Sequence, residues 1–159
     1  EYVGYHAPMT HRPHLAALAA ALLFLTGCAT MTGSELELTA DGRLPPCPSS
    51  PNCVSSDADP DDGIHYIEPL QIDGDPQAAW QRLVEYVESD SAYTIVEQRN
   101  DYLRAEARTK ILRFVDDVIF HLRPGEGVIA MRSSSRLGLS DLGKNRGRLE
   151  AVREALNTT

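Results

Sequence analysis

The sequence predicts an α+β fold: a single two-layer domain in which an antiparallel sheet of about five strands carries two helices on one face. Two segments, 76–89 and 144–156, have apolar residues at helical spacing. Four strand-like segments lie between them and one precedes the first, so the order is strand, helix, four strands, helix. The 132 residues after position 27 are enough for one domain with its own core and too few for two.

The first strand is expected at His65–Leu70. The helix that follows begins with a capping Asp75 and then Pro76, a residue that suits the first helical position. Strands are predicted at Tyr93–Gln98 and at Tyr102–Arg108, the second with alternating apolar and polar residues. This alternation predicts that one face of that strand is exposed to water.

A hairpin is the strongest local prediction. Its strands are Ile111–Leu122 and Val128–Ser135, joined through Pro124-Gly125-Glu126-Gly127. If Gly125-Glu126 is a two-residue loop, paired positions sum to 251, and this register places apolar residues of the two strands on one face. The last helix then packs its inner face with apolar residues, namely Leu149, Val152, Ala155 and Leu156.

The N-terminal part has the pattern of a bacterial lipoprotein signal. A short basic stretch begins at Met9, and Leu15–Leu25 is an unbroken apolar run of 11 residues. This run is too short for a transmembrane helix, which needs roughly 20 residues. It ends in Leu25-Thr26-Gly27-Cys28, which resembles the lipobox, in which the chain is cut before a diacylated cysteine. The alternative is an ordinary secretory signal with a chance cysteine.

This pattern sets the expected domain organisation. Residues 1–27 are upstream sequence and signal peptide with Met9 as the true start, 28–44 are the lipidated Cys28 and a flexible tether, and 45–159 are one globular domain. Two acyl chains anchor a protein stably where one is marginal. Ala29, in place of Asp, resembles the sorting pattern for the outer membrane, facing the periplasm.

Charge and cysteines narrow the function classes. The net charge of −8 argues against nucleic-acid binding and against electrostatic attachment of the whole chain to anionic lipid. In an oxidising compartment Cys47 and Cys53 are most simply a disulfide, within a segment, 45–63, that is expected to be loop throughout. A metal site has no nearby His or further Cys to complete it, and free or redox-active thiols are the third alternative.

The end of the hairpin away from its turn is polar. The register places Asp116 opposite Ser135 and Asp117 opposite Ser134, with Arg132 and Arg136 on the face of Asp117. The loop after the hairpin is glycine-rich, and Asp141 or Asn145 is expected to cap the last helix. The candidate cluster comprises Asp116, Asp117, Arg132, Ser133, Ser134, Ser135, Arg136, Ser140, Asp141, Asn145 and Arg146.

Three interpretations of this cluster remain open. Arg132, Arg136 and Arg146 with the helix N-terminus would form a pocket for an anion. Alternatively, Asp116 and Asp117 neutralise these arginines in a structural network. The third interpretation uses the acidic pair for general acid–base chemistry. No familiar catalytic motif is present in the sequence, and we assign no catalytic residue, metal or cofactor.

Three motifs together resemble the uncharacterised bacterial family known as domain-of-unknown-function family 1499. They are Cys47-Pro48-Ser49-Ser50-Pro51-Asn52-Cys53-Val54-Ser55-Ser56, Arg113-Phe114-Val115-Asp116-Asp117, and Arg132-Ser133-Ser134-Ser135-Arg136 followed by Ser140-Asp141-Leu142-Gly143 and Asn145-Arg146. The resemblance covers about residues 45–156 and implies no activity. It does imply that the polar cluster acts as one unit.

We therefore expect a non-catalytic binding module on a lipid-anchored protein of the bacterial cell envelope. Its expected partners are the membrane, through the lipid on Cys28, and an anionic small ligand or an envelope protein. The alternatives are a hydrolase-like enzyme that uses Asp116 and Asp117 with the surrounding arginines and serines, or a purely structural envelope protein.

Overall fold

The computed structural model describes residue 4 and residues 36–109, 113–138 and 140–157. Residues 33–159 form one compact unit. The predicted signal segment and Cys28 lie outside the described residues. None of the described helices is long and apolar enough to cross a membrane.

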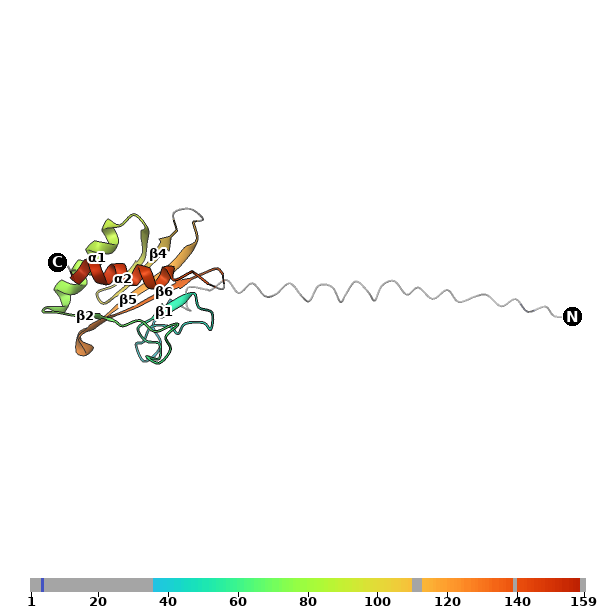
Figure 1. Ribbon diagram of the computed structural model, residues 1–159, viewed down its shortest axis with the longest axis horizontal. Coiled ribbons are helices and arrows are strands. Elements are labelled where there is room, and N and C mark those ends of the chain that lie inside the picture. The colour runs from blue at the N-terminus through green and yellow to red at the C-terminus, as the bar shows by residue number, and fades with distance from the viewer. Residues whose placement is uncertain (1–3, 5–35, 110–112, 139, 158–159) are drawn as a thin grey trace. The chain divides into compact units, whose positions relative to one another are not determined.

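The sheet has six strands, and every strand pair in it is antiparallel. Its order is β1-β6-β5-β4-β3, and β2 also pairs with β6 (Figure 1). The strands are β1 (Cys53–Ser55), β2 (Leu70–Gln71), β3 (Tyr93–Gln98), β4 (Tyr102–Arg108), β5 (Val115–Arg123) and β6 (Val128–Ser135). The α+β fold and its order of strands and helices are confirmed.

Both helices cover the same face of the sheet, as Figure 1 shows. They are α1 (Pro76–Ser89) and α2 (Lys144–Asn157). The Asp75 carboxylate accepts a hydrogen bond from the Ala78 amide at 2.7 Å, as expected of an N-cap. Trp80 and Leu149 are buried in the core between the helices and the sheet.

The hairpin register is confirmed, because all eight pairs between β5 and β6 sum to 251. The connection is longer than two residues: η2 (Pro124–Glu126) is a single 3-10 turn, and Gly127 follows with φ 69°. The register is unchanged because the four-residue connection is centred on the same point as the expected two-residue loop. Strand β5 starts at Val115 and not at Ile111.

The expected first strand at His65–Leu70 is wrong. Only Leu70 of that segment is in a strand, and Tyr66 forms an isolated parallel bridge with Ser55. Pro69 has no amide hydrogen to give to a sheet. In addition, Arg153 of α2 donates to the carbonyl oxygens of Glu68 and Pro69, so side chains take the place of a neighbouring strand.

Strand β1, conversely, lies inside the segment 45–63 that was expected to be a loop throughout. Cys53, Val54 and Ser55 pair with the last part of β6. A three-residue strand is too short to show a hydrophobic period, which explains why the sequence pattern missed it.

The second face of the sheet is also covered. Leu36 and Leu44 are buried against Tyr102, Ile119 and Ala130. The Tyr102 hydroxyl donates to the Leu36 carbonyl at 2.9 Å. This corrects two expectations: residues 36–44 belong to the packed domain and not to the tether, and the second face of β4 is not exposed to water where Tyr102 lies.

Candidate functional site

The strand register separates the two acidic residues of the predicted cluster. Asp116 and Asp117 are neighbours in β5, and successive side chains of a strand point to opposite faces. Asp116 therefore lies on the face covered by the helices, whereas Asp117 lies on the face covered by residues 36–44 and the disulfide loop. The cluster that the sequence suggests as one unit is two networks, one on each face.

The helix-face network (Asp116, Ser133, Ser135, Asn145 and Arg148) centres on Asn145, which is fully buried. The Asn145 side-chain amide donates to the Ser135 hydroxyl at 3.0 Å, and its oxygen accepts from the Ser133 hydroxyl at 2.6 Å. Arg148 donates to the same Asn145 oxygen at 2.7 Å and pairs with the Asp116 carboxylate at 2.6 Å. Asp116 is thereby neutralised by Arg148.

This network also fixes the disulfide loop to α2. The Asn145 amide donates to the Asn52 carbonyl at 2.8 Å. The Asn52 side chain donates to the Gly138 carbonyl at 2.7 Å, and the Ser135 amide donates to the Asn52 carbonyl at 2.9 Å. Asn52, 4% exposed, thus joins the disulfide loop, the end of β6 and the start of α2.

Asp141 caps α2, and it is one of the two residues, Asp141 and Asn145, that were expected to do so. Its carboxylate accepts from the amides of Gly143 at 3.0 Å and Asn145 at 2.6 Å. Ser140, also part of the predicted cluster, accepts from the Leu142 amide at 3.3 Å. These contacts satisfy backbone groups at the helix start, so neither side chain is directed at a ligand by its hydrogen bonds.

The disulfide-face network contains Asp117, Arg132, Ser134, Arg136 and Glu106. Arg136 donates to both oxygens of Asp117, each at 2.7 Å, and to Glu106 at 2.7 Å. Asp117 is buried, and these hydrogen bonds raise the pKa of the Arg136 guanidinium. Ser134, which pairs with both Asp117 and Cys53, is buried between the strands.

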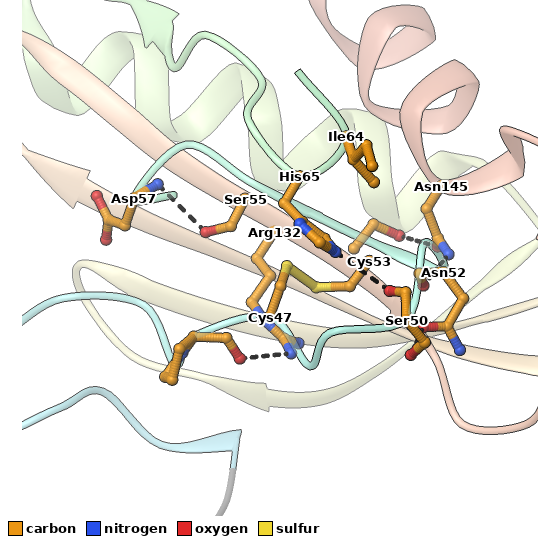
Figure 2. The surroundings of a disulfide bond; sticks show 12 residues. Cys47, Ser50, Asn52, Cys53, Ser55, Asp57, Ile64, His65, Arg132 and Asn145 are labelled. Carbon is orange, nitrogen blue, oxygen red and sulfur yellow. Dashed lines mark hydrogen bonds between the residues drawn. A yellow bond between two sulfur atoms is a disulfide. The ribbon is translucent and has the colours of Figure 1, made fainter. Parts of the chain in front are cut away.

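Arg132 is the exceptional member of this network because it is only 1% exposed and has no carboxylate bonded to it. Its Nη2 donates to the Pro46 carbonyl at 3.4 Å, and its Nε and Nη1 have no hydrogen-bond partner among the described residues. Burial lowers the pKa of Arg132 to about 10, an effect that the charge of Asp117 opposes. Figure 2 shows the Arg132 side chain beside the Cys47–Cys53 disulfide.

The predicted disulfide between Cys47 and Cys53 is present, with an S–S distance of 2.02 Å. His65 contacts the disulfide loop, because its Nε2 lies 3.2 Å from the Ser50 carbonyl (Figure 2). Its Nδ1 lies 2.6 Å from Asp62 Oδ2. The hydrogen bond with Asp62 raises the pKa of His65. In the described ranges, no group of three or more His, Cys, Asp or Glu could hold a metal ion.

The structure does not bring together the three arginines of the expected anion pocket. Arg132 is buried under the disulfide loop, and Arg136 is occupied by two carboxylates. Arg146 donates to the carbonyls of Gly63 and Ile64 at 3.4 and 3.1 Å. A shallow groove of about 360 Å³ lies between α2 and residues 66–68, and of these three arginines Arg146 alone lines it. Its lining residues are Tyr66, Ile67, Glu68, Arg146, Glu150 and Arg153.

Four residues that hold these networks or the start of the domain in place were not proposed as site residues from the sequence. They are Asn52, Arg148, Glu106 and Arg123. Arg148 follows Asn145 at helical spacing, so a stricter use of the helical period would have found it. Arg123 donates to Asp57 at 2.8 Å and holds the start of the domain, and no short-range signal marks that contact.

The fold and the site thus define the class of protein. It is an α+β domain that contains a disulfide and carries a polar cluster with paired charges on each face of its sheet. Residues 43–156 match the sequence profile of the family described as Protein of unknown function (DUF1499), and the chain belongs to this family. Neither the comparison with curated proteins nor the comparison with solved structures found a match.

Proposed function

We propose that the chain is a lipid-anchored protein of the bacterial cell envelope whose DUF1499 domain is a non-catalytic protein-binding module. The anchor is the diacylated Cys28, and Ala29 favours the outer membrane with the domain facing the periplasm. A disulfide between Cys47 and Cys53 is consistent with such an oxidising compartment.

One observation carries the non-catalytic part of the proposal. Asp116 and Asp117 point to opposite faces of the sheet, and each is already ion-paired with an arginine. A general acid–base pair must reach one substrate from both carboxyl groups, in a pocket that admits the substrate. The two networks therefore support a structural role, in which they fix the disulfide loop and α2 to the sheet.

A protein partner suits this surface better than a small anion. The groove beside α2 is open and shallow, and it carries two arginines and two glutamates. The guanidinium groups of Arg146 and Arg153 donate to backbone carbonyls of the chain segment that forms the groove wall, so they are already engaged within the protein. An open surface with mixed charges fits a polypeptide segment, whereas a small ligand prefers an enclosed pocket.

The anchor is tested by acylation. In bacteria grown with radioactive palmitate, the wild-type chain expressed from Met9 should be labelled and should fractionate with membranes. Cys28→Ser should lose both properties, whereas the matched variant Cys53→Ser should keep the label, because its thiol is not at the lipobox. Label retained on Cys28→Ser would rule out this cysteine as the acylation site.

The binding surface is tested by photo-crosslinking in cells. A photoreactive residue in place of Tyr66, in the groove, should give a discrete adduct with an envelope protein. The same residue in place of Gln81, which is exposed on α1, is the control. Adducts that are absent from position 66, or equal at the two positions, would argue against the groove.

A further inference from the structure

Exposed apolar side chains gather around one end of the sheet. Among the described residues, five large hydrophobic side chains are exposed, and four of them belong to the segments that meet at the polar end of the hairpin. We call these four the apolar end: Ile64 (60% exposed), Phe114 (48%), Leu137 (72%) and Leu142 (91%). Exposed apolar side chains that form a large contiguous patch mark an interaction surface.

The hydrogen bonds bring the segments of the apolar end to the same edge. The Arg136 amide donates to the Val115 carbonyl at 3.3 Å, so Phe114 and Leu137 follow directly where β5 and β6 stop pairing. Leu142 lies in the same loop as Leu137, just before α2. Ile64 lies beside the first turn of α2, because its carbonyl accepts from Arg146 at 3.1 Å.

Two residues at this end have an unfavourable backbone conformation. Leu142 has φ 55° and Arg113 has φ 54°, and they are the only non-glycine residues with positive φ in the part of the chain that the structure describes. Such conformations are unfavourable for side chains other than those of Gly, Asn and Asp, and they concentrate at functional sites. Leu142 combines this conformation with nearly complete exposure, so folding alone gives no reason for a leucine there.

Basic residues accompany the apolar ones. Arg113 and Lys144 are both exposed, and neither forms an ion pair with a described residue. The chain carries a net charge of −8, and Asp61 and Asp62 precede Ile64, so attraction to an anionic surface at this end rests on Arg113 and Lys144. Apolar side chains flanked by unpaired cations complement an anionic phospholipid surface, where the cations meet phosphates and the apolar groups enter the interface.

A short tether would keep the whole domain close to the membrane. Because Leu36 is packed on the sheet, only eight residue steps separate it from Cys28. Fully extended, they span at most about 28 Å, which is close to the diameter of a small domain. This step rests on the proposed lipid anchor. A domain held so close would meet the bilayer continually, and its surface chemistry would decide which end faces it.

We propose that the apolar end docks on the surface of an anionic phospholipid membrane. Leu137 and Leu142 enter the interfacial layer, and Arg113 and Lys144 face the lipid phosphates. The bilayer thereby orients the anchored domain.

The experiment uses tryptophan as a depth probe in the full chain. The chain has one tryptophan, Trp80, which is buried in the core and serves as a constant background. Leu142→Trp reports on the apolar end, and Glu126→Trp, in the exposed hairpin connection at the other end of the strands, is the matched control. The proteins are reconstituted with vesicles of phosphatidylethanolamine and phosphatidylglycerol, or of phosphatidylcholine alone, each with brominated acyl chains as quenchers.

On the anionic vesicles, Leu142→Trp emission should shift to the blue and be quenched, and Glu126→Trp emission should not. Adding Arg113→Glu and Lys144→Glu should abolish the quenching, whereas Arg82→Glu on α1 should not. Flotation of the protein with the vesicles measures membrane attachment through the lipid anchor, independently of the tryptophan quenching. A chain that floats with both vesicle types but shows equal quenching at the two positions overturns the docking surface and leaves the lipid anchor standing.

The remaining outcomes also distinguish membrane docking from the lipid anchor. A chain that floats only with anionic vesicles, with Leu142→Trp quenched, supports docking and argues against the anchor. Flotation with neither type overturns both proposals. A blue shift of Leu142→Trp that appears without vesicles as the protein is concentrated would assign the surface to a second copy of the chain and overturn membrane docking.

Discussion

At the residue scale, Arg132 has the least compensation from hydrogen bonds among the buried charged residues that the structure describes. A buried ion without a partner is unfavourable by several kcal/mol, because water is lost and nothing replaces it. The carboxylate of Asp117 lies close enough to oppose the effect of burial on the pKa of Arg132, although its hydrogen bonds go to Arg136. Asp117 therefore neutralises one arginine directly and supports a second through space.

This arrangement predicts a large effect of Asp117→Ala. Removing one partner of a buried pair typically lowers the free energy of unfolding by about 3–5 kcal/mol. We expect about 3 kcal/mol, near the lower limit, because Arg136 is partly exposed and keeps Glu106. Urea denaturation measures the change. Asp73→Ala, at an exposed position, is the control and should have almost no effect. A wild-type midpoint for Asp117→Ala would contradict the structural role of this network.

His65 predicts a pH dependence with a definite sign. Its pKa is raised above the ordinary 6.5, first by the hydrogen bond with Asp62. The stabilisation is therefore complete below 6.5 and is lost as the pH rises through the raised folded-state pKa. The unfolding free energy of the wild-type protein should fall over that range. His65→Gln should remove this fall, and His121→Gln should keep it; urea titrations at several pH values compare the three proteins.

At the element scale, the start of α2 depends on one side chain. Asp141 accepts from two amides there, so Asp141→Ala should destabilise the protein by about 1 kcal/mol, the usual effect of losing an N-cap. Ser140→Ala is the matched control, because its hydroxyl makes one longer contact. Thermal unfolding measures both variants, and equal melting temperatures would contradict the capping role.

The disulfide is an element with its own prediction. A bridge across six residues restricts the unfolded chain and should add about 2 kcal/mol to the free energy of unfolding in the chain-entropy estimate. The loss should appear in Cys47→Ser/Cys53→Ser and in wild-type protein treated with reductant. Reductant should not change the double variant further. Two alkylated thiols in unreduced, denatured protein from the periplasm would remove the bridge from this account.

Elements with a clear hydrophobic period could be predicted from the sequence to within a residue or two. Helix α1, with Trp80 and Leu83 on its buried face, and strands β3 and β4 have the predicted bounds. Strand β1 was not predictable in this way, because three residues carry no period. The expected strand before α1 failed for another reason: Arg153 satisfies its carbonyl groups from a helix far away in sequence.

The candidate site was predictable only as far as local register reaches. The positions of Asp116 and Asp117 opposite Ser135 and Ser134 followed from the hairpin. The segments that cover each face of the sheet could not be predicted in this way. They depend on contacts over long sequence separations, such as that of Arg132 with Pro46. The interpretation of the cluster as one unit overlooked the strand alternation, which sends neighbouring acids to opposite faces.

At the scale of the whole molecule, the sheet lies between two coverings of different kinds. The helices bury one face with a large apolar core. On the other face, residues 36–44 bury a smaller apolar cluster, and Arg123 holds the following segment through Asp57. Burial raises the pKa of Asp57, but the hydrogen bonds from Arg123 and the Leu44 amide outweigh this effect and lower it overall. The start of the domain is thus fixed by apolar packing together with an ion pair.

This arrangement predicts that the domain needs its first residues. A chain that begins at residue 45 would leave Tyr102 and Ile119 uncovered, although both are buried in the complete domain. Losing the burial of Leu36 and Leu44, at about 1.5–3 kcal/mol each, would remove roughly 3–6 kcal/mol, a large part of the ~5–15 kcal/mol that stabilises a typical domain. Urea denaturation of chains 33–159 and 45–159 compares the two. The shorter chain should unfold at lower urea and bind a dye for exposed apolar surface, and equal midpoints would show that residues 36–44 contribute nothing to the fold.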